Sequence, residues 1–338
     1  MQFSFSLRNT ALAAALLALA AAAAHSQQAP PPASEPPAAP AAQAPPADPV
    51  FPKPDPHNFN ADSPSVDTVN DFLRQTWGFD PNRVWQVEQI SRTAAPGVTK
   101  VSVAVAEKGQ KDQQGMMEFF VTPDGKHIIA NGVLPFGSKP FEEHRQLLAA
   151  KATGPARGAP TKDLLLVEFA DFQCPYCKEA QPTIQKLLQD FPNAHFVYEN
   201  FPLSQHSEAP KAAAYSVCVA KTGGDEAFYK YSDVVFENQA ALTPEGSDKA
   251  LKDAVTKIGL DPEKIAACST TPEAKAAVDE SKNLAQELEV PSTPTLYVNG
   301  RGISLGNTPY ENLKQIVAYQ ATLDGVSTAP KPPTLGKP

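Results

Sequence analysis

The chain has 338 residues and 35 prolines, and its 29 Lys and Arg against 37 Asp and Glu give a net charge of −8. This length favours two domains, and the acidic surplus argues against binding to nucleic-acid phosphates, which needs an excess of Lys and Arg. No internal apolar run reaches the roughly 20 residues that a membrane span requires.

The first 26 residues have the layout of a secretory signal peptide. Arg8 carries the only charge, residues 10–24 are mostly Ala and Leu, and small residues lead to Ser26. The alternatives are an uncleaved signal anchor that tethers the protein to a membrane, and a disordered Ala-rich segment. Cleavage predicts a periplasmic or secreted protein whose four cysteines enter an oxidising compartment, where disulfides persist.

Residues 27–64 are predicted to form a disordered linker. Proline clusters such as 30–32 favour the polyproline II conformation of a semi-rigid spacer. The segment has few large apolar side chains with which to offset its ordering entropy. Residues 326–338 are predicted to be a similar disordered tail.

Residues 65–150 are predicted to be a small α+β accessory domain that serves in docking or dimerisation. A helix begins near Val66, where apolar residues recur on one face up to Trp77. Four antiparallel strands and a closing helix are expected at 83–90, 98–106, 116–122, 127–133 and 141–150. The segment contains no nucleophile motif, metal-ligand cluster or phosphate loop.

A redox centre is predicted where a buried strand meets a helix. The apolar run Leu164–Ala170 leads into Cys174-Pro175-Tyr176-Cys177, and a helix with an apolar face follows. The first cysteine lies at a helix N-terminus, where unpaired N–H groups and the helix dipole favour a thiolate. Cys174 is therefore expected to be the attacking thiolate, and Cys177 the resolving thiol.

Two other readings of this Cys-x-x-Cys are weaker. A zinc site needs further ligands at fitting spacing, and the sequence offers no second Cys-x-x-Cys or His-x-His. A purely structural Cys174–Cys177 disulfide is the other alternative. We therefore predict no metal and no cofactor.

The segment 172–177 resembles the active site of the DsbA-like branch of the thioredoxin superfamily. Family features recur around it: Glu168 six residues before the first cysteine, Pro182 five after the second, and a cis-proline loop with Thr293 and Pro294. The resemblance implies an α/β thioredoxin fold over residues 155–325. It also implies an all-helical insertion at about 207–288.

The resemblance assigns roles to four more residues. Glu168, beneath Cys177, is expected to accept or deliver its proton, and the Thr293 backbone is expected to pair with an extended substrate. Pro294 is expected to face the sulfurs and exclude metals. Pro175 and Tyr176 tune the potential, and because Tyr176 replaces the histidine usual in strong oxidases, a milder oxidant than DsbA is expected.

Cys218 and Cys268 both fall in the helical insertion. Their positions allow two buried thiols or one bridge, and an oxidising compartment favours a structural disulfide. Some members of the resembled family carry a second disulfide in this insertion, which supports the pairing.

Three functions are compatible with the sequence. The first is a periplasmic oxidase that donates disulfides to unfolded or partly oxidised secreted proteins and is recharged by a membrane or soluble redox partner. The second is an isomerase or reductase of the DsbC/DsbG kind, dimeric through an N-terminal domain that weakly resembles theirs. The third is a holdase or binding module without turnover, which the intact cysteine pair, Glu168 and Pro294 argue against.

Overall fold

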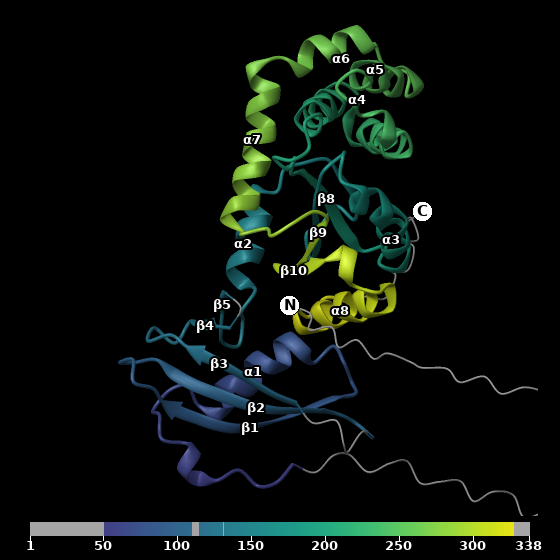
Figure 1. Ribbon diagram of the computed structural model, residues 1–338. Helices are drawn as coiled ribbons and strands as arrows, with labels where there is room; N and C mark the ends of the chain where they lie inside the picture. The colour runs from purple at the N-terminus through teal and green to yellow at the C-terminus, as the bar shows by residue number, and fades with distance from the viewer. Residues whose placement is uncertain (1–50, 110–114, 131, 328–338) are drawn as a thin grey trace, which may run out of the picture.

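The structure is a computed structural model, and it describes residues 51–109, 115–130 and 132–327. Two five-stranded sheets organise these residues, one in an N-terminal unit and one in a larger unit capped by helices (Figure 1). The predicted signal peptide, the linker up to residue 50 and the tail from residue 328 lie outside the described residues.

The N-terminal unit is an antiparallel sheet with one helix on its inner face. Strands follow chain order in the sheet: β1 (Arg83–Arg92), β2 (Thr99–Glu107), β3 (Gly115–Val121), β4 (His127–Ile129) and β5 (Val133–Pro135). Helix α1 (Val66–Trp77) begins at Ser65, whose hydroxyl accepts a hydrogen bond from the Thr68 N–H. Its apolar face packs Val69, Phe72 and Leu73 against the sheet.

Two details of this unit differ from the sequence prediction. The strand expected at 127–133 is divided into β4 and β5, which pair as a tight hairpin. The expected disordered linker is ordered from residue 51: Phe59 bridges to Ile90, and the Asn60 side chain accepts from the Arg92 N–H at 2.9 Å. Phe59 and Ala61 pack on the core and supply the apolar contact that the proline clusters lack.

Helix α2 (Glu142–Lys151) belongs by its packing to the larger unit, although it was predicted to close the accessory domain. Leu148 and Ala152 are buried in the cluster that contains Leu165 and Val167 of the second sheet. The helix begins directly after the accessory strands, so its place along the chain suggested the wrong partner. Figure 1 shows α2 beside the lower end of α7.

The second sheet has the strand order β10-β9-β7-β8-β6. Strands β7 (Leu164–Ala170) and β8 (Ala194–Asn200) are parallel, and β6 (Ala156–Gly158), β9 (Thr295–Val298) and β10 (Arg301–Ser304) add antiparallel. Helices α3 (Pro175–Asp190) and α8 (Tyr310–Leu323) cover one face, and α2 with α7 covers the other. This arrangement confirms the predicted thioredoxin fold.

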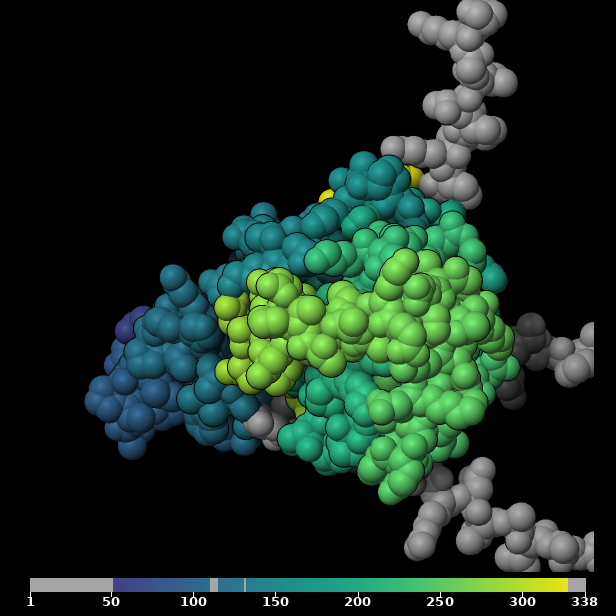
Figure 2. All heavy atoms as spheres, turned by 90° about the horizontal axis from the view of Figure 1, so that it is seen from above, coloured from purple at the N-terminus to yellow at the C-terminus, as the bar shows by residue number. Residues whose placement is uncertain are grey.

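A helical cap fills the predicted insertion. It consists of α4 (Ala209–Glu237), α5 (Ser247–Lys257), α6 (Pro262–Ser269) and the upper part of α7 (Pro272–Glu287), which lie above the sheet in Figure 1 and face the viewer in Figure 2. Helix α4 bends at Gly224, whose φ of 77° lies in the left-handed region that favours glycine. A disulfide joins Cys218 in α4 to Cys268 in α6.

Arg301 fixes the N-terminal unit to the larger one. Its guanidinium is largely buried and donates to the carbonyls of Gln75 at 3.2 Å and Thr76 at 2.7 Å, at the end of α1. A cation suits this position because the last carbonyls of a helix are unpaired and carry partial negative charge. The Tyr319 hydroxyl adds a bond to the Arg74 carbonyl at 2.9 Å.

Among the described residues, none of the helices is both long and apolar enough to cross a membrane.

Candidate active site

The two thiols lie where β7 ends and α3 begins. All seven residues of β7 are buried, which fixes the strand end from which the loop leaves. Cys174 is the N-cap residue of α3, and its carbonyl accepts from the Cys177 N–H at 3.1 Å and the Lys178 N–H at 3.3 Å. Pro175 occupies the first helical position, where a missing N–H costs nothing.

Cys174 and Cys177 are free thiols with opposite acidities. A hydrogen bond from the Cys177 thiol, aided by Thr293 and by N–H groups at the helix start, lowers the pKa of Cys174 to about 6 against the opposing effect of burial. Burial, followed by the neighbouring Cys174 sulfur, raises the pKa of Cys177 well above its usual range. At neutral pH Cys174 is therefore mainly a thiolate and Cys177 a thiol.

The loop that contains Thr293 and Pro294 faces the first thiol. The Thr293–Pro294 peptide bond is cis, and the Cys174 thiol donates to the Thr293 carbonyl at 3.5 Å. Beyond the proline, the Leu305 N–H donates to the Pro294 carbonyl at 3.1 Å and holds the loop. The structure therefore brings the two predicted motifs together across 119 residues of chain.

Glu168 is completely buried on β7, and neither carboxyl oxygen has a hydrogen-bond partner within the described residues. Burial raises the pKa of Glu168 to about 7, and the positive charge of Arg157 opposes the shift. The negative charge of Glu168 in turn contributes to the raised pKa of Cys177. A buried acid that titrates near neutral pH beside the second thiol is suited to proton transfer.

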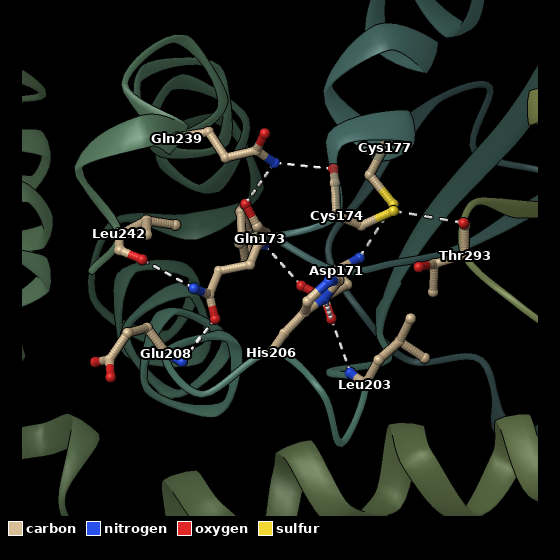
Figure 3. A network of polar contacts seen from close by, with 11 residues as sticks. Asp171, Gln173, Cys174, Cys177, Leu203, His206, Glu208, Gln239, Leu242 and Thr293 are labelled. Atoms are coloured by element: carbon tan, nitrogen blue, oxygen red, sulfur yellow. Dashed lines mark hydrogen bonds and ion pairs between the residues drawn. The ribbon is translucent and has the colours of Figure 1, made fainter. Parts of the chain in front are cut away.

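Asp171, which the sequence analysis did not single out, shapes the loop between β7 and Cys174. Its buried carboxylate accepts from the Gln173 N–H at 2.7 Å and the Leu203 N–H at 2.8 Å, and His206 Nδ1 lies 2.8 Å from it (Figure 3). Its own N–H donates to the Cys177 sulfur at 3.4 Å. An acidic residue directly after a buried strand was the signal that could have identified it.

Two glutamines tie the thiol loop to the helical cap. The Gln173 amide donates to the Leu242 carbonyl at 2.8 Å and accepts from the Glu208 N–H at 2.6 Å. Gln239 donates to the carbonyls of Phe172 at 2.8 Å and Cys174 at 2.9 Å (Figure 3). No local sequence pattern marks Gln239, because its partners lie more than 60 residues away.

The other predicted site residues lie at the edge of this centre or outside it. Tyr176 is 60% exposed, so its phenol is free to meet a partner. Cys218 and Cys268 belong to the cap, bonded to each other. Within the described ranges, no group of three or more His, Cys, Asp or Glu side chains is arranged to hold a metal ion.

Comparison with known proteins identifies the larger unit. The family model described as thioredoxin matches residues 150–318, which are 169 of the 338 residues, and leaves out the N-terminal unit. A Na⁺/H⁺ antiporter NhaA 1 of Salinispora arenicola is 30% identical over 146 residues, which are 43% of this chain and 21% of that protein. A probable disulfide bond formation protein D of Bacillus cereus is 26% identical over 175 residues, 50% of this chain and 79% of that protein.

The chain thus spans about a fifth of the length of the first curated relatives that it matches. Among solved structures, a thioredoxin-like oxidoreductase from Silicibacter pomeroyi is 26% identical with a TM-score of 0.44, and it covers 52% of this chain and 95% of its own. BdbD from Bacillus subtilis is 24% identical with a TM-score of 0.45, and it covers 50% of this chain and 93% of its own.

Proposed function

Because the chain belongs to the thioredoxin family, we propose that it is a thiol–disulfide oxidoreductase in which Cys174 and Cys177 exchange disulfides with secreted proteins outside the cytoplasm. The expected partners are unfolded or partly oxidised polypeptides and a membrane or soluble protein that restores the redox state. The signal-peptide pattern of the first 26 residues supports a periplasmic or secreted location, with a membrane tether as the alternative.

The opposite acidities of the two thiols carry the proposal. Thiol–disulfide exchange needs one thiolate that attacks or is attacked, and a second thiol that stays protonated until the mixed disulfide is resolved. Cys174, with a pKa of about 6 at the helix N-terminus, suits the first role. The buried Cys177, with a raised pKa, suits the second.

Oxidation of a substrate then proceeds in two exchanges. A substrate thiolate attacks the Cys174 sulfur, the Cys174–Cys177 bond breaks, and Cys177 leaves as a thiolate that takes a proton from Glu168. A second substrate thiolate attacks its own sulfur in the mixed disulfide, and Cys174 leaves as a stabilised thiolate. The substrate loses two electrons, which the enzyme disulfide gains, and reduction of a substrate is the same sequence reversed.

The surroundings of the thiols give the remaining residues their proposed roles. Thr293 and cis-Pro294 form an edge beside Cys174 on which an extended polypeptide can pair. Pro175 starts the helix whose N-terminus stabilises the thiolate. The exposed Tyr176 side chain offers no positive charge to Cys174, which supports a milder oxidant.

The test is an exchange assay with reduced, unfolded ribonuclease A and the oxidised full-length protein. We expect two ribonuclease thiols to be lost for each Cys174–Cys177 disulfide reduced, with Cys174→Ser inactive and the double variant Cys218→Ala/Cys268→Ala active. Binding without loss of thiols would favour the holdase alternative. Faster reactivation of scrambled than of reduced ribonuclease would favour the isomerase alternative.

A further inference from the structure

Three side chains on the second sheet carry buried polar atoms without a protein partner in the part of the chain that the structure describes. These atoms are Arg157 Nε, both carboxyl oxygens of Glu168, and the Tyr198 hydroxyl. Glu168 is 0% and Tyr198 1% exposed. The active-site chemistry described above uses only Glu168, so the other two require a separate explanation.

Strand register places the three side chains on one face of the sheet. Glu168 of β7 pairs with Tyr198 of β8, and Arg157 of β6 pairs with Phe196 of β8. Residues two apart on a strand share a face, so Phe196 and Tyr198 point the same way and Arg157 lies one strand further out. The polar atoms therefore follow a line from the buried strand towards the sheet edge.

Arg157 is the outer end of this line. Its guanidinium lies 4.3 Å from the ring centre of Tyr229 and 5.2 Å from that of Phe196. The same residue lines an open surface hollow of about 340 Å³, together with Gly158, Gln185, Leu188, Gln189, Phe191, Pro192 and Ala194. Solvent thus reaches the arginine from outside, and the buried carboxyl feels its charge from inside.

Unpaired buried polar groups are costly, at about 1–3 kcal/mol each. Buried water commonly satisfies such groups, with roughly one internal water per 27 residues in globular proteins. Two carboxyl oxygens, a hydroxyl and a guanidinium N–H offer both acceptors and donors, which a bridging water needs. The three side chains are thus suited to hold water.

We propose that Glu168, Tyr198 and Arg157 hold an internal water chain that carries protons between Cys177 and the hollow at Arg157. This inference rests on the proposed function and deepens it. Tyr198 relays the proton, because a hydroxyl can accept one hydrogen bond while it donates another. Arg157 keeps its proton and acts as a positioning residue that orients the water and favours the ionised form of Glu168.

The proton balance fits both directions of exchange. When Cys177 leaves the enzyme disulfide as a thiolate, it takes the Glu168 proton, and a proton from the hollow restores the acid through water and Tyr198. When the Cys177 thiol attacks a mixed disulfide, Glu168 accepts its proton, and the same chain returns that proton to solvent. The sulfur–sulfur bonds change as described above, and no further oxidant is required.

The groups around Glu168 define what its ionisation reports. Cys177 faces it from α3, Tyr198 from β8, Arg157 from β6 and Tyr229 from α4. Asp171, in the loop after β7, shares the electrostatic surroundings of Tyr198. On β9 the register partner of Glu168 is the apolar Leu296. Arg157 is therefore the cation whose removal is expected to change the pKa of Glu168 most directly.

The test is a stopped-flow measurement of the step in which Cys177 resolves a mixed disulfide between Cys174 and a fluorescent peptide, between about pH 5 and pH 9. Arg157→Met is expected to move the pH midpoint upward by about one unit, because a lost positive charge disfavours the carboxylate. Arg157→Lys should restore the midpoint. Tyr198→Phe should lower the plateau rate about tenfold or more without moving the midpoint, whereas Tyr229→Phe, which loses a hydroxyl bonded to Pro155, should match the wild type.

A second measurement does not depend on activity or on the variants. A high-resolution crystal structure of the wild-type protein is expected to contain ordered water within hydrogen-bond distance of Glu168 and Tyr198. A dry site, or Arg157→Met and Tyr198→Phe with wild-type pH profiles, would overturn the water chain. If the wild-type protein fails to exchange disulfides while the water is present, the proposed function fails and the hydrated site stands.

Discussion

The side-chain amide of Gln239, in the helical cap, donates a hydrogen bond of 2.9 Å to the carbonyl of Cys174 in the thiol loop. The same nitrogen donates to the Phe172 carbonyl at 2.8 Å. Both carbonyls belong to the turn that starts α3, so one side chain from the cap holds the backbone on either side of Gln173. The inserted helices thus contact the redox centre directly.

Replacing Gln239 is therefore expected to change the redox centre from outside it. Gln239→Glu puts a carboxylate oxygen against two carbonyls, which should lower the free energy of unfolding by about 1–3 kcal/mol and raise the pKa of Cys174. Urea denaturation and thiolate absorbance against pH would measure both effects. Asn238→Ala is the matched control, because Asn238 bonds only to Val234 within its own helix; equal effects in both variants would contradict the assignment.

The assignment of thiol roles predicts different trapping by the two cysteine variants. Cys177→Ala should accumulate mixed disulfides with substrate proteins, because the nucleophile remains and the resolving thiol is lost. Cys174→Ala should accumulate none, because Cys177 is fully buried and its pKa is raised. Non-reducing gels of extracts would show the adducts, and equal trapping by Cys174→Ala would reverse the assignment.

The Cys218–Cys268 disulfide is expected to stabilise the cap without taking part in exchange. It closes a loop with a sequence separation of 50, which the chain-entropy model converts to about 4 kcal/mol. Urea denaturation of Cys218→Ala/Cys268→Ala should show a loss of this size, while substrate oxidation persists under native conditions. Alkylation of either cysteine in the oxidised wild-type protein would disprove the pairing.

The dipeptide between the thiols predicts an intermediate redox potential. Tyr176 supplies no positive charge near Cys174, so the reduced form is less stabilised than in DsbA, and a value between roughly −120 and −230 mV is expected. Tyr176→His should raise the potential and lower the pKa of Cys174, whereas Tyr176→Phe should change neither. Equilibration with glutathione buffers measures all three proteins, and a wild-type value at or above the upper limit that Tyr176→His leaves unchanged would show that another group sets the potential.

Glu168 makes the folded protein less stable as the pH rises. Its pKa increases from 4.5 to about 7 on folding, so the folded state binds the proton more tightly and stability falls between these pH values, then levels off. Glu168→Gln should remove this slope and raise the free energy of unfolding by about 3 kcal/mol at about pH 8. Denaturation curves across this range provide the test.

Glu199→Gln is the matched control for Glu168. Glu199 is also a buried carboxyl whose pKa is raised, first by burial, but it accepts hydrogen bonds from the Ser281 hydroxyl and the Gly154 N–H. Its replacement breaks existing bonds and should reduce stability. A gain in both variants would mean that burial alone decides, and that the partners of Glu199 contribute nothing.

The sequence predicted the parts of the site that are local. The apolar strand, the Cys174–Cys177 spacing and the helix after it follow from neighbouring residues, and the structure has β7 and α3 where they were expected. Gln239 and Arg157 were not identified, because they reach the centre only through the packing of the cap and of an edge strand. Helix α2 was given to the wrong unit for the same reason: its few apolar residues fit either core, and only the fold selects one.

Arg301 joins α1 to the end of the second sheet where β7 begins, because it follows the turn after β9, and Val298 pairs with Leu166 near the start of β7. Cys174 lies beyond the other end of that strand, about 20 Å away for seven residues. A macromolecule seated on the β1–β5 sheet and a polypeptide linked to Cys174 would therefore occupy opposite poles. Neither blocks the other, so the N-terminal unit can serve as a handle by which the enzyme is held while its thiols continue to turn over.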